Sequence, residues 1–284
     1  METTRASRTA RMVALNILAL GSKRGMENVR PPGIVEATAR LLRESGEAGP
    51  RTISFARSRA AVGLYLAFDW MLPGQFEAFA HRKAFCERQV RKGIQAGARQ
   101  VLVLGAGYDT LGWRLAPEFT EVAFFEIDHP ATARVKARGI ERMGARPNLH
   151  LLAEDLGERR LADVVETVKI WDRTAPAIII AEGLLMYLSP AAVGNLFRQC
   201  AEVTGPGSRL AFTYLGTRRD GRPDAGPWTW LWLRVLESGG EPWLWAIRPE
   251  ELGAFLLERG WGMDLGQTIG SGRKGVEFFG LAVR

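Results

Sequence analysis

The sequence is poor in cysteine and has no long apolar segment. Cys86 and Cys200 are the only cysteines among 284 residues, too few to supply the disulfide framework of a small secreted domain. We therefore expect a reducing compartment, the cytoplasm. No apolar run reaches the roughly eighteen residues that a membrane-spanning helix needs, so we expect no such helix.

Histidine is equally scarce. The three histidines, His81, His129 and His150, are not spaced as the ligands of a metal ion usually are. We therefore expect no structural or catalytic zinc site. The same scarcity leaves few side chains that could act as a general base toward a hydroxyl group at neutral pH.

The first 24 residues begin with basic side chains and a short apolar run, as secretion signals do. Asn16 interrupts the run, however, and no small-residue cleavage site follows it. The apolar residues recur instead at helical spacing, at Met12, Leu15, Leu18 and Ala19. The segment is therefore predicted to form an amphipathic helix.

Positive charge is in excess but is not concentrated. Lys and Arg number 38 against 31 Asp and Glu, for a net charge of +7, and the basic residues are spread from Arg5 to Arg284. No dense basic run interleaved with aromatic residues marks a nucleic-acid interface. We expect neither a nucleic-acid nor a membrane partner, and a small molecule as the substrate.

Two patterns divide the chain near residue 97. Residues 1–97 are mostly compatible with helices, including predicted helices at Arg57–Trp70 and Phe76–Ile94, and are interpreted as a helical cap. Residues 98–284 alternate short apolar runs with helical stretches, as in a parallel sheet covered on both faces. The five predicted strands are Val101–Leu104, Val122–Ile127, Leu149–Ala153, Ala177–Ala181 and Leu210–Tyr214.

The tail departs from this alternation. An aromatic-rich insertion occupies about residues 215–248, and a helix with Pro at its first turn is predicted at Pro249–Arg259. Trp261–Ile269 and Gly275–Val283 are predicted to form a final antiparallel pair of strands. Between the earlier strands, the predicted helices are Ala131–Arg142, Leu161–Val168 and Pro190–Val203. The prediction is one structural unit, an α/β, doubly wound, Rossmann-like fold.

A glycine-containing turn follows the first predicted strand in the segment Leu104-Gly-Ala-Gly-Tyr-Asp-Thr110. Gly105 and Gly107 allow backbone amides to approach a ligand closely, although a plain tight turn would also use glycine. A dinucleotide-binding fingerprint would have a third glycine where Thr110 stands. The turn therefore favours a ligand without a pyrophosphate over NAD.

Carboxylates follow the ends of the later strands. Asp128 ends the second strand, where it could accept hydrogen bonds from both ribose hydroxyls or cap the helix that begins near Pro130. Asp155 lies just past the third strand, as an adenine-binding or solvated loop acid, and Glu182 follows the fourth. Glu126 alternates to the other face of the sheet and is less suited to reach a ligand. Because the carboxyl ends of parallel strands share one edge of the sheet, we expect Asp128, Asp155 and Glu182 to converge on one crevice.

These motifs resemble those of the leucine carboxyl methyltransferase family, whose bacterial members include polyketide O-methyltransferases similar to tetracenomycin carboxyl methyltransferase. The resemblance covers about Ala80 to Tyr214 and implies S-adenosylmethionine as cofactor. It also implies a class I methyltransferase fold with a mostly parallel seven-stranded sheet. The segments that carry it are Gly105-Ala-Gly-Tyr-Asp-Thr110 with Trp113-Arg-Leu115, Phe125-Glu-Ile-Asp-His-Pro130 and Ala181-Glu-Gly-Leu-Leu-Met-Tyr-Leu188.

The same resemblance implies which residues would bind each part of the cofactor. Arg82, on the helix before the first strand, would bind the cofactor carboxylate. Asp128 would bind the ribose, and Asp155 and Leu156 the adenine. The residues that would surround the methionine portion or line its pocket are Gly105, Ala106, Gly107, Asp109 and Glu182.

The methyl acceptor is expected to be a carboxylate of a small, hydrophobic or aromatic metabolite. A carboxylate is already ionised at neutral pH and needs no general base, and an arginine would hold it by a paired contact. Arg57, Arg59 and Arg248 are the candidates for that arginine. The alternative is a hydroxyl acceptor on a natural product, for which Tyr187 or Tyr214 would lie near the crevice.

Alternatives also remain for the insertion and for the class of function. The tryptophans of the insertion either form an aromatic wall over the substrate, in which Trp230 is the residue to test, or pack a cap helix on the sheet. These tryptophans are Trp228, Trp230, Trp232, Trp243 and Trp245. An NAD(P)-dependent oxidoreductase, which Thr110 disfavours, and a non-catalytic cofactor-binding protein are the competing classes.

Overall fold

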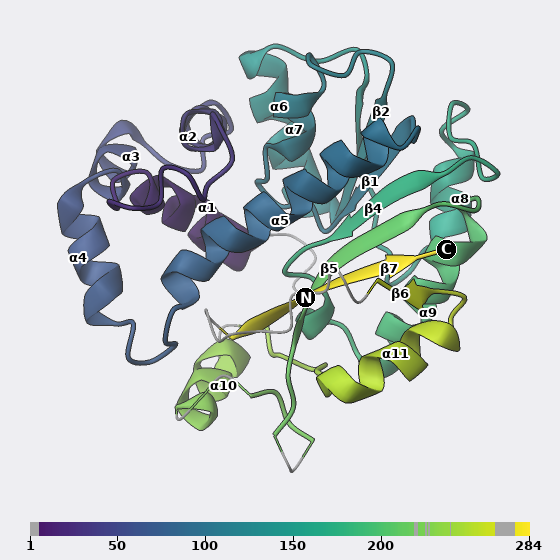
Figure 1. Cartoon of the computed structure of the whole chain (residues 1–284). Helices are drawn as coiled ribbons and strands as arrows, with labels where there is room; N and C mark the ends of the chain where they lie inside the picture. Colours follow the sequence, from purple (N-terminus) through teal and green to yellow (C-terminus); the bar gives the residue numbers. More distant parts are fainter. Residues whose placement is uncertain (1–5, 219–220, 225, 227, 239, 265–275) are drawn as a thin grey trace.

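The computed structural model describes residues 6–218, 221–224, 226, 228–238, 240–264 and 276–284 (Figure 1). Its centre is a seven-stranded sheet with the strand order β3-β2-β1-β4-β5-β7-β6. Strands β1 to β5 run parallel, whereas β7 pairs antiparallel with both β5 and β6. The mostly parallel seven-stranded sheet predicted from the sequence is therefore confirmed.

The five parallel strands lie where the sequence predicts them, to within one residue at either end. They are β1 Gln100–Leu104, β2 Ala123–Asp128, β3 Leu149–Ala153, β4 Ala177–Ala181 and β5 Arg209–Leu215. The last two strands are β6 Gly262–Met263 and β7 Glu277–Val283, with β7 inserted between β5 and β6. β6 is shorter than the predicted strand Trp261–Ile269, whose residues 265–269 lie outside the described part of the chain.

The strands are continuously apolar because both faces of the sheet are covered. In β1, Leu102 and Leu104 pack into one core cluster with α8, α9 and α11, whereas Val101 and Val103 pack into another with α5 and α6. Figure 1 shows these helices on the two sides of the sheet, with α7 beside α6. The helices are α5 Gln75–Gln95, α6 Leu111–Leu115, α7 Pro130–Met143, α8 Leu161–Glu166, α9 Pro190–Glu202 and α11 Pro249–Leu257.

Four N-terminal helices form a third core cluster, which includes Ile140 and Met143 of α7. They are α1 Arg8–Leu20, α2 Ile34–Glu44, α3 Pro50–Ala56 and α4 Arg59–Ala67. The predicted N-terminal helix is confirmed as α1. Leu18 and Ala19 of its predicted apolar face are buried, whereas Met12, predicted on the same face, is exposed. None of the helices in the described ranges is long and apolar enough to cross a membrane.

The segment between β5 and α11 contains α10 Thr229–Ser238, within the predicted insertion. The chain after α10 is tied to the short 3-10 helix η1 Leu185–Tyr187, because the Leu244 N–H donates to the Met186 carbonyl over 2.6 Å. The Ile247 N–H donates to the Leu215 carbonyl over 3.0 Å. These bonds bring the end of the insertion next to the segment that follows β4.

Close packing of α5 on β4 depends on Gly93. A Cβ atom at this position would overlap Cγ1 of Ile178, whereas a Cβ on Gly63 in α4 would meet open space. Gly93→Ala should therefore lower the free energy of unfolding by about 1–3 kcal/mol, by overpacking. Gly63→Ala should raise it by about 0.5–1 kcal/mol, since alanine is the better helix former. Urea unfolding measures both; a Gly93→Ala protein as stable as the wild type would contradict this packing.

Candidate functional site

A cavity of about 930 Å³ lies at the carboxyl ends of the parallel strands. This is the edge at which open α/β sheets bind their ligands. The segments after β1, β2, β3 and β4 all contribute to its wall, together with α1, α4, α5 and the end of the insertion. All nine residues predicted to bind the cofactor line it: Arg82, Gly105, Ala106, Gly107, Asp109, Asp128, Asp155, Leu156 and Glu182.

The glycine turn after β1 needs glycine for two reasons. Gly105 and Gly107 have φ values of 63° and 48°, which L side chains rarely adopt. A Cβ on Gly105 would also stand 2.9 Å from Cδ1 of Leu184, and one on Gly107 3.1 Å from Cβ of Ala10. The turn is thus pressed between the segment after β4 and α1, and its backbone forms part of the cavity wall.

Asp128 stabilises this turn. Its Oδ2 accepts a hydrogen bond of 2.6 Å from the Gly107 N–H. Burial raises the pKa of Asp128, while the same N–H acts to lower it. The helix-capping role considered for Asp128 belongs to its neighbour, because Nδ1 of His129 accepts from the Ala131 N–H at the start of α7. Asp128 therefore faces the cavity and the turn.

The next segment of wall comes from the chain after β3. Asp155 Oδ1 accepts a hydrogen bond of 2.8 Å from the Gly157 N–H, and its Oδ2 lies 3.6 Å from Nε2 of His129. Glu126, by contrast, is on the other face of the sheet, where Lys136 pairs with it over 2.7 Å. The alternation of side chains along β2 thus separates a cavity-lining acid from a buried structural one.

A network of buried charges joins α5 to three strand ends; we call Arg82, Lys83, Asp109, Glu182 and Glu277 the charge network. Arg82 Nε lies 2.7 Å from Glu182 Oε1, and Arg82 Nη1 lies 2.5 Å from Glu277 Oε1. Lys83 Nζ lies 2.9 Å from Asp109 Oδ2 and 3.0 Å from Glu182 Oε2. No side chain of the network is more than 11% exposed. With two basic and three acidic side chains, its formal net charge is −1.

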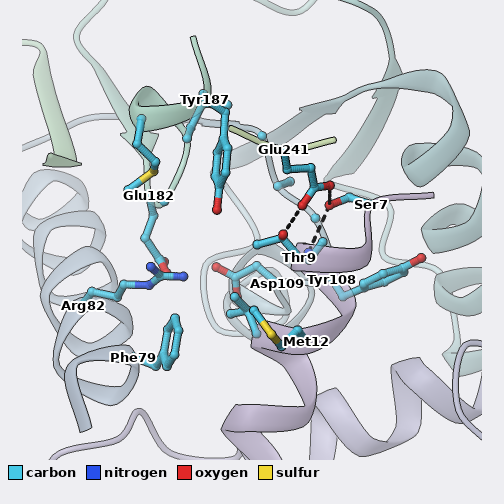
Figure 2. Close-up of a pocket in the computed structure, with 18 of the residues that line it drawn as sticks. Ser7, Thr9, Met12, Phe79, Arg82, Tyr108, Asp109, Glu182, Tyr187 and Glu241 are labelled. Atoms are coloured by element: carbon cyan, nitrogen blue, oxygen red, sulfur yellow. Dashed lines mark hydrogen bonds and ion pairs between the residues drawn. The ribbon is translucent and has the colours of Figure 1, made fainter. Parts of the chain in front are cut away.

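The network keeps the Asp109 carboxylate ionised despite burial. Burial opposes ionisation of Asp109, yet the charges of Lys83, Lys136 and Arg114 outweigh it and lower the pKa of Asp109 to about 2. The guanidinium of Arg82 also lies 4.5 Å from the ring centre of Phe79, a cation–π contact (Figure 2). A preformed site of mixed charge results, open to the cavity.

Sequence reasoning missed two members of the network. Neither Lys83 nor Glu277 is among the residues predicted to bind the cofactor, and Glu277 lies beyond the segments that carry the family resemblance. Glu277 also accepts a hydrogen bond of 3.0 Å from the amide of Gln75 in α5. An acid at the start of an otherwise apolar strand, Glu277-Phe-Phe-Gly, was the available signal.

The cavity extends from the charge network into a mostly apolar region. Tyr65 of α4 and Phe76 of α5 stack there with ring centres 4.7 Å apart. Tyr187 of η1 points its hydroxyl group into the cavity (Figure 2), and burial raises the pKa of that group. Trp243 of the insertion also lines this region.

The N-terminal end of α1 and the insertion meet at the cavity. The Glu241 carboxylate accepts hydrogen bonds from the hydroxyls of Ser7, over 3.0 Å, and Thr9 (Figure 2). All three residues line the cavity. Segments more than 200 positions apart in the chain thus close the same stretch of wall.

The proposed acceptor residues lie elsewhere, apart from Tyr187. Tyr214 is 1% exposed and stacks on Phe278 in the core, with ring centres 5.2 Å apart. Arg57 and Arg248 pair at the surface with Glu36 and Glu251. The residues that were predicted to contact the acceptor but lie outside the cavity lining are Tyr214, Arg57, Arg59, Arg248 and Trp230. Sequence alone could not separate these from cavity residues, because arginine and tryptophan serve surfaces and sites alike.

Comparison with known proteins shows which family the chain matches. Residues 36–201, more than half of the chain, match the family model described as leucine carboxyl methyltransferase. A protein of Mycolicibacterium paratuberculosis (strain ATCC BAA-968 / K-10), provisionally named an S-adenosyl-L-methionine-dependent methyltransferase, is 34% identical over 140 residues, 49% of this chain and 43% of that protein. A protein of the same name from Mycolicibacterium gilvum (strain PYR-GCK) is 32% identical over 168 residues, 59% and 52% of the two chains.

The chain spans about half the length of the curated relatives it matches. Among solved structures, a protein from Thermobifida fusca YX, provisionally described as a methyltransferase, matches with a TM-score of 0.57 and 18% identity. The match covers 92% of this chain and 97% of that one, so the two share a fold along nearly their whole lengths.

The ionised state of Asp109 makes a prediction about acid stability. Because its folded-state pKa of about 2 lies below the ordinary 3.8, Asp109 contributes stability above about pH 4 that is lost as the pH falls through about 2. The stability advantage of wild type over Asp109→Asn should therefore shrink between about pH 5 and about pH 2 in urea unfolding. Asp163→Asn, at an exposed position on α8, serves as control. An advantage that stays constant or grows in acid would contradict the network.

Proposed function

The chain belongs to the leucine carboxyl methyltransferase family, and from this premise we propose that it transfers a methyl group from S-adenosylmethionine to an oxygen of a small, largely apolar acceptor. The observation that carries the proposal is the convergence of the charge network, the glycine turn and Asp128 on one cavity wall. An apolar region adjoins them in the same cavity, where an acceptor would have room.

The residues of the wall fit this cofactor in charge and in shape. When bound, S-adenosylmethionine supplies a methyl group carried on a positively charged sulfur. Its amino-acid end is a zwitterion, which a network of two cations and three carboxylates can bind at both charges. The net charge of −1 would then balance the sulfonium. Arg82 would hold the carboxylate, and the backbone of the Gly105–Gly107 turn, packed against Leu184 and Ala10, would lie beside it.

The remaining parts of the cofactor have their own candidates. Asp128 would accept hydrogen bonds from the ribose hydroxyls, since its carboxylate lies on the cavity wall beside the glycine turn. Asp155 and Leu156 would contact the adenine. The Gly157 N–H holds the Asp155 carboxylate in place, so that the acid is oriented before a ligand arrives.

We propose a carboxylate as the accepting group. A carboxylate is a nucleophile at neutral pH without a general base, so the protein need only align it and exclude water. The apolar wall formed by Tyr65, Phe76 and Phe79 would hold the body of an aromatic or aliphatic acid. Holding reactants in line can supply about 7–11 kcal/mol of the barrier reduction.

A hydroxyl acceptor is the second candidate, and one observation favours it. Among the described residues that line the cavity, Arg82 and Lys83 are the only arginine or lysine, and both are paired within the charge network. An acceptor carboxylate would therefore have no cation of its own among those residues. Tyr187, whose hydroxyl group points into the cavity, would position a hydroxyl acceptor by a hydrogen bond.

Calorimetric titration tests the cofactor. Wild type should bind S-adenosylhomocysteine and not NADH. Asp128→Asn should weaken that binding about tenfold or more, because hydrogen bonds to an ionised acceptor contribute about 1.5–3 kcal/mol. Asp163→Asn, an exposed acid outside the cavity lining, should bind as the wild type does. Binding of NADH, or an Asp128→Asn protein with unchanged affinity, would refute this assignment.

The chemistry of the product tests the acceptor. The enzyme is incubated with methyl-labelled cofactor and matched pairs of aromatic or aliphatic acids and the corresponding alcohols. A methyl ester releases volatile labelled methanol in mild alkali, whereas a methyl ether does not. We expect alkali-labile label in the acid series. Alkali-stable label found with the alcohols instead would replace the carboxylate by the hydroxyl acceptor.

A further inference from the structure

Asn16 is a polar residue in an apolar stretch of α1. It is the one polar residue between Met12 and Leu20 in the sequence, and it is 5% exposed. Its amide oxygen, Oδ1, is enclosed by protein and has no hydrogen-bond partner among the described residues. A buried carbonyl oxygen without a partner lowers stability, and native proteins retain few of them. Asparagine is also a poor helix former, so Asn16 destabilises α1 in two ways.

The face of α1 that carries Asn16 lines the cavity. Thr9, Met12, Val13 and Asn16 all belong to the cavity lining. Their spacing of i, i+3, i+4 and i+7 places them on one face of the helix. Figure 2 shows Thr9 and Met12 of this face at the cavity. Thr9 is hydrogen-bonded to Glu241, whereas the Asn16 oxygen has no such partner in the described part of the chain.

Asn16 lies away from the glycine turn, toward the cap. At one end of α1, Ala10 stands against the turn, because a Cβ on Gly107 would lie 3.1 Å from Cβ of Ala10. Past the other end, a Cβ on Gly21 would lie 2.8 Å from Cγ1 of Val35 in α2. Asn16 is six residues beyond Ala10, which is about 9 Å along the helix axis. Figure 1 shows α1 beside α2 and α5, on the cap side of the sheet.

The cavity wall near Asn16 is largely apolar. Ile17, the next residue of α1, packs in the same core cluster as Phe76 and Phe79 of α5, and all three line the cavity. Phe76 and Phe79 belong to the wall that we propose to hold the body of the acceptor. An acceptor in this region would therefore meet a polar amide in an apolar wall.

The amide of Asn16 can turn either of its polar atoms to the cavity. The oxygen is the enclosed atom in the present orientation, and the nitrogen is not enclosed in this way. Rotation about the Cβ–Cγ bond of asparagine is soft, and half a turn exchanges an oxygen and a nitrogen of similar size. A hydroxyl group suits both orientations, because it donates to the oxygen and accepts from the nitrogen.

We propose that Asn16 is a specificity residue that binds a hydroxyl group on the body of the acceptor, distinct from the oxygen that is methylated. The inference rests on the proposed function and narrows its substrate class to apolar acids that carry a hydroxyl group. A site built to bind a hydroxyl group rejects the analogue without it, because the polar group of the site is then left unpaired. Recognition of this kind accounts for a destabilising residue at this position.

Matched acids test the recognition. Phenylpropanoic acid is compared with its ring-hydroxylated forms, and decanoic acid with hydroxydecanoic acids, counting only alkali-labile label so that methyl esters alone are measured. Wild type should favour the hydroxylated member of a pair by about tenfold or more in kcat/KM. Asn16→Leu should lose this preference. Asn195→Leu, which changes an exposed amide elsewhere in the lining, should keep it. A wild type without the preference, or an Asn16→Leu protein that retains it, would overturn the proposal.

Thermal unfolding gives a readout that does not depend on the acceptor. Asn16→Leu should melt about 2–4 °C above wild type, because it removes an unpaired amide oxygen. Gln199→Leu is the matched comparison and should melt below wild type. Gln199 also lines the cavity from a helix, but its Oε1 accepts from the Leu161 N–H over 2.6 Å. Asn16→Ala repeats the test without added volume. Melting of both Asn16 variants below wild type would mean that the amide stabilises the fold, against the proposal.

Failure of the proposed function gives a different result. A wild type that binds S-adenosylhomocysteine but forms a methyl ester with none of the acids would refute the carboxylate acceptor. The same acid pairs are therefore also titrated by calorimetry in the presence of S-adenosylhomocysteine. Tighter binding of the hydroxylated member by wild type, lost in Asn16→Leu, would support the hydroxyl site independently of turnover. Equal binding of both members by wild type would refute it.

Discussion

The buried charge network is the constraint on which the rest of the site depends. Its five side chains come from α5, the turn after β1, the end of β4 and the start of β7, so each ion pair fixes one element against another. Removing one partner of a buried pair costs about 3–5 kcal/mol, since the other charge is left without compensation. The ion pairs therefore hold these elements in fixed positions relative to one another, and the cavity wall that they form is preorganised. A site of this kind needs little rearrangement to receive a zwitterionic ligand.

Much of the fold could be predicted because its strands are buried on both faces. Runs such as Ile178-Ile-Ile180 have no polar side to obscure them, and the acids Asp128 and Glu182 stand where such runs stop. The part that could not be predicted depends on contacts between distant segments. Glu277 meets Arg82 across 195 positions, and only the insertion of β7 beside β5 brings them together. The helix α6 has five residues, too few for a periodic pattern to be recognised.

The apolar region of the cavity, proposed to hold the acceptor, is even harder to predict from the sequence. The tryptophans of the insertion whose side chains are described occupy three environments: Trp243 lines the cavity, Trp245 is buried in the core, and Trp228 and Trp230 are exposed. Nothing in the local sequence distinguishes them, because the fate of each depends on how the chain after β5 returns over η1. The side of the cavity proposed to bind the cofactor is thus built on the sheet. The side proposed for the acceptor is built from the cap and the insertion, where members of one fold differ most readily.

The central claim is that the charge network binds the carboxylate and ammonium groups of the cofactor and makes no contact with its adenosine part. It is tested most directly by comparing the affinities of S-adenosylhomocysteine and methylthioadenosine, which lacks the amino-acid carboxylate and ammonium, for wild type and Arg82→Lys. Lysine keeps the charge but loses the forked geometry that pairs with carboxylates. The account predicts that the substitution weakens only S-adenosylhomocysteine and leaves methylthioadenosine bound as before. Equal weakening of both ligands, or of neither, would contradict it.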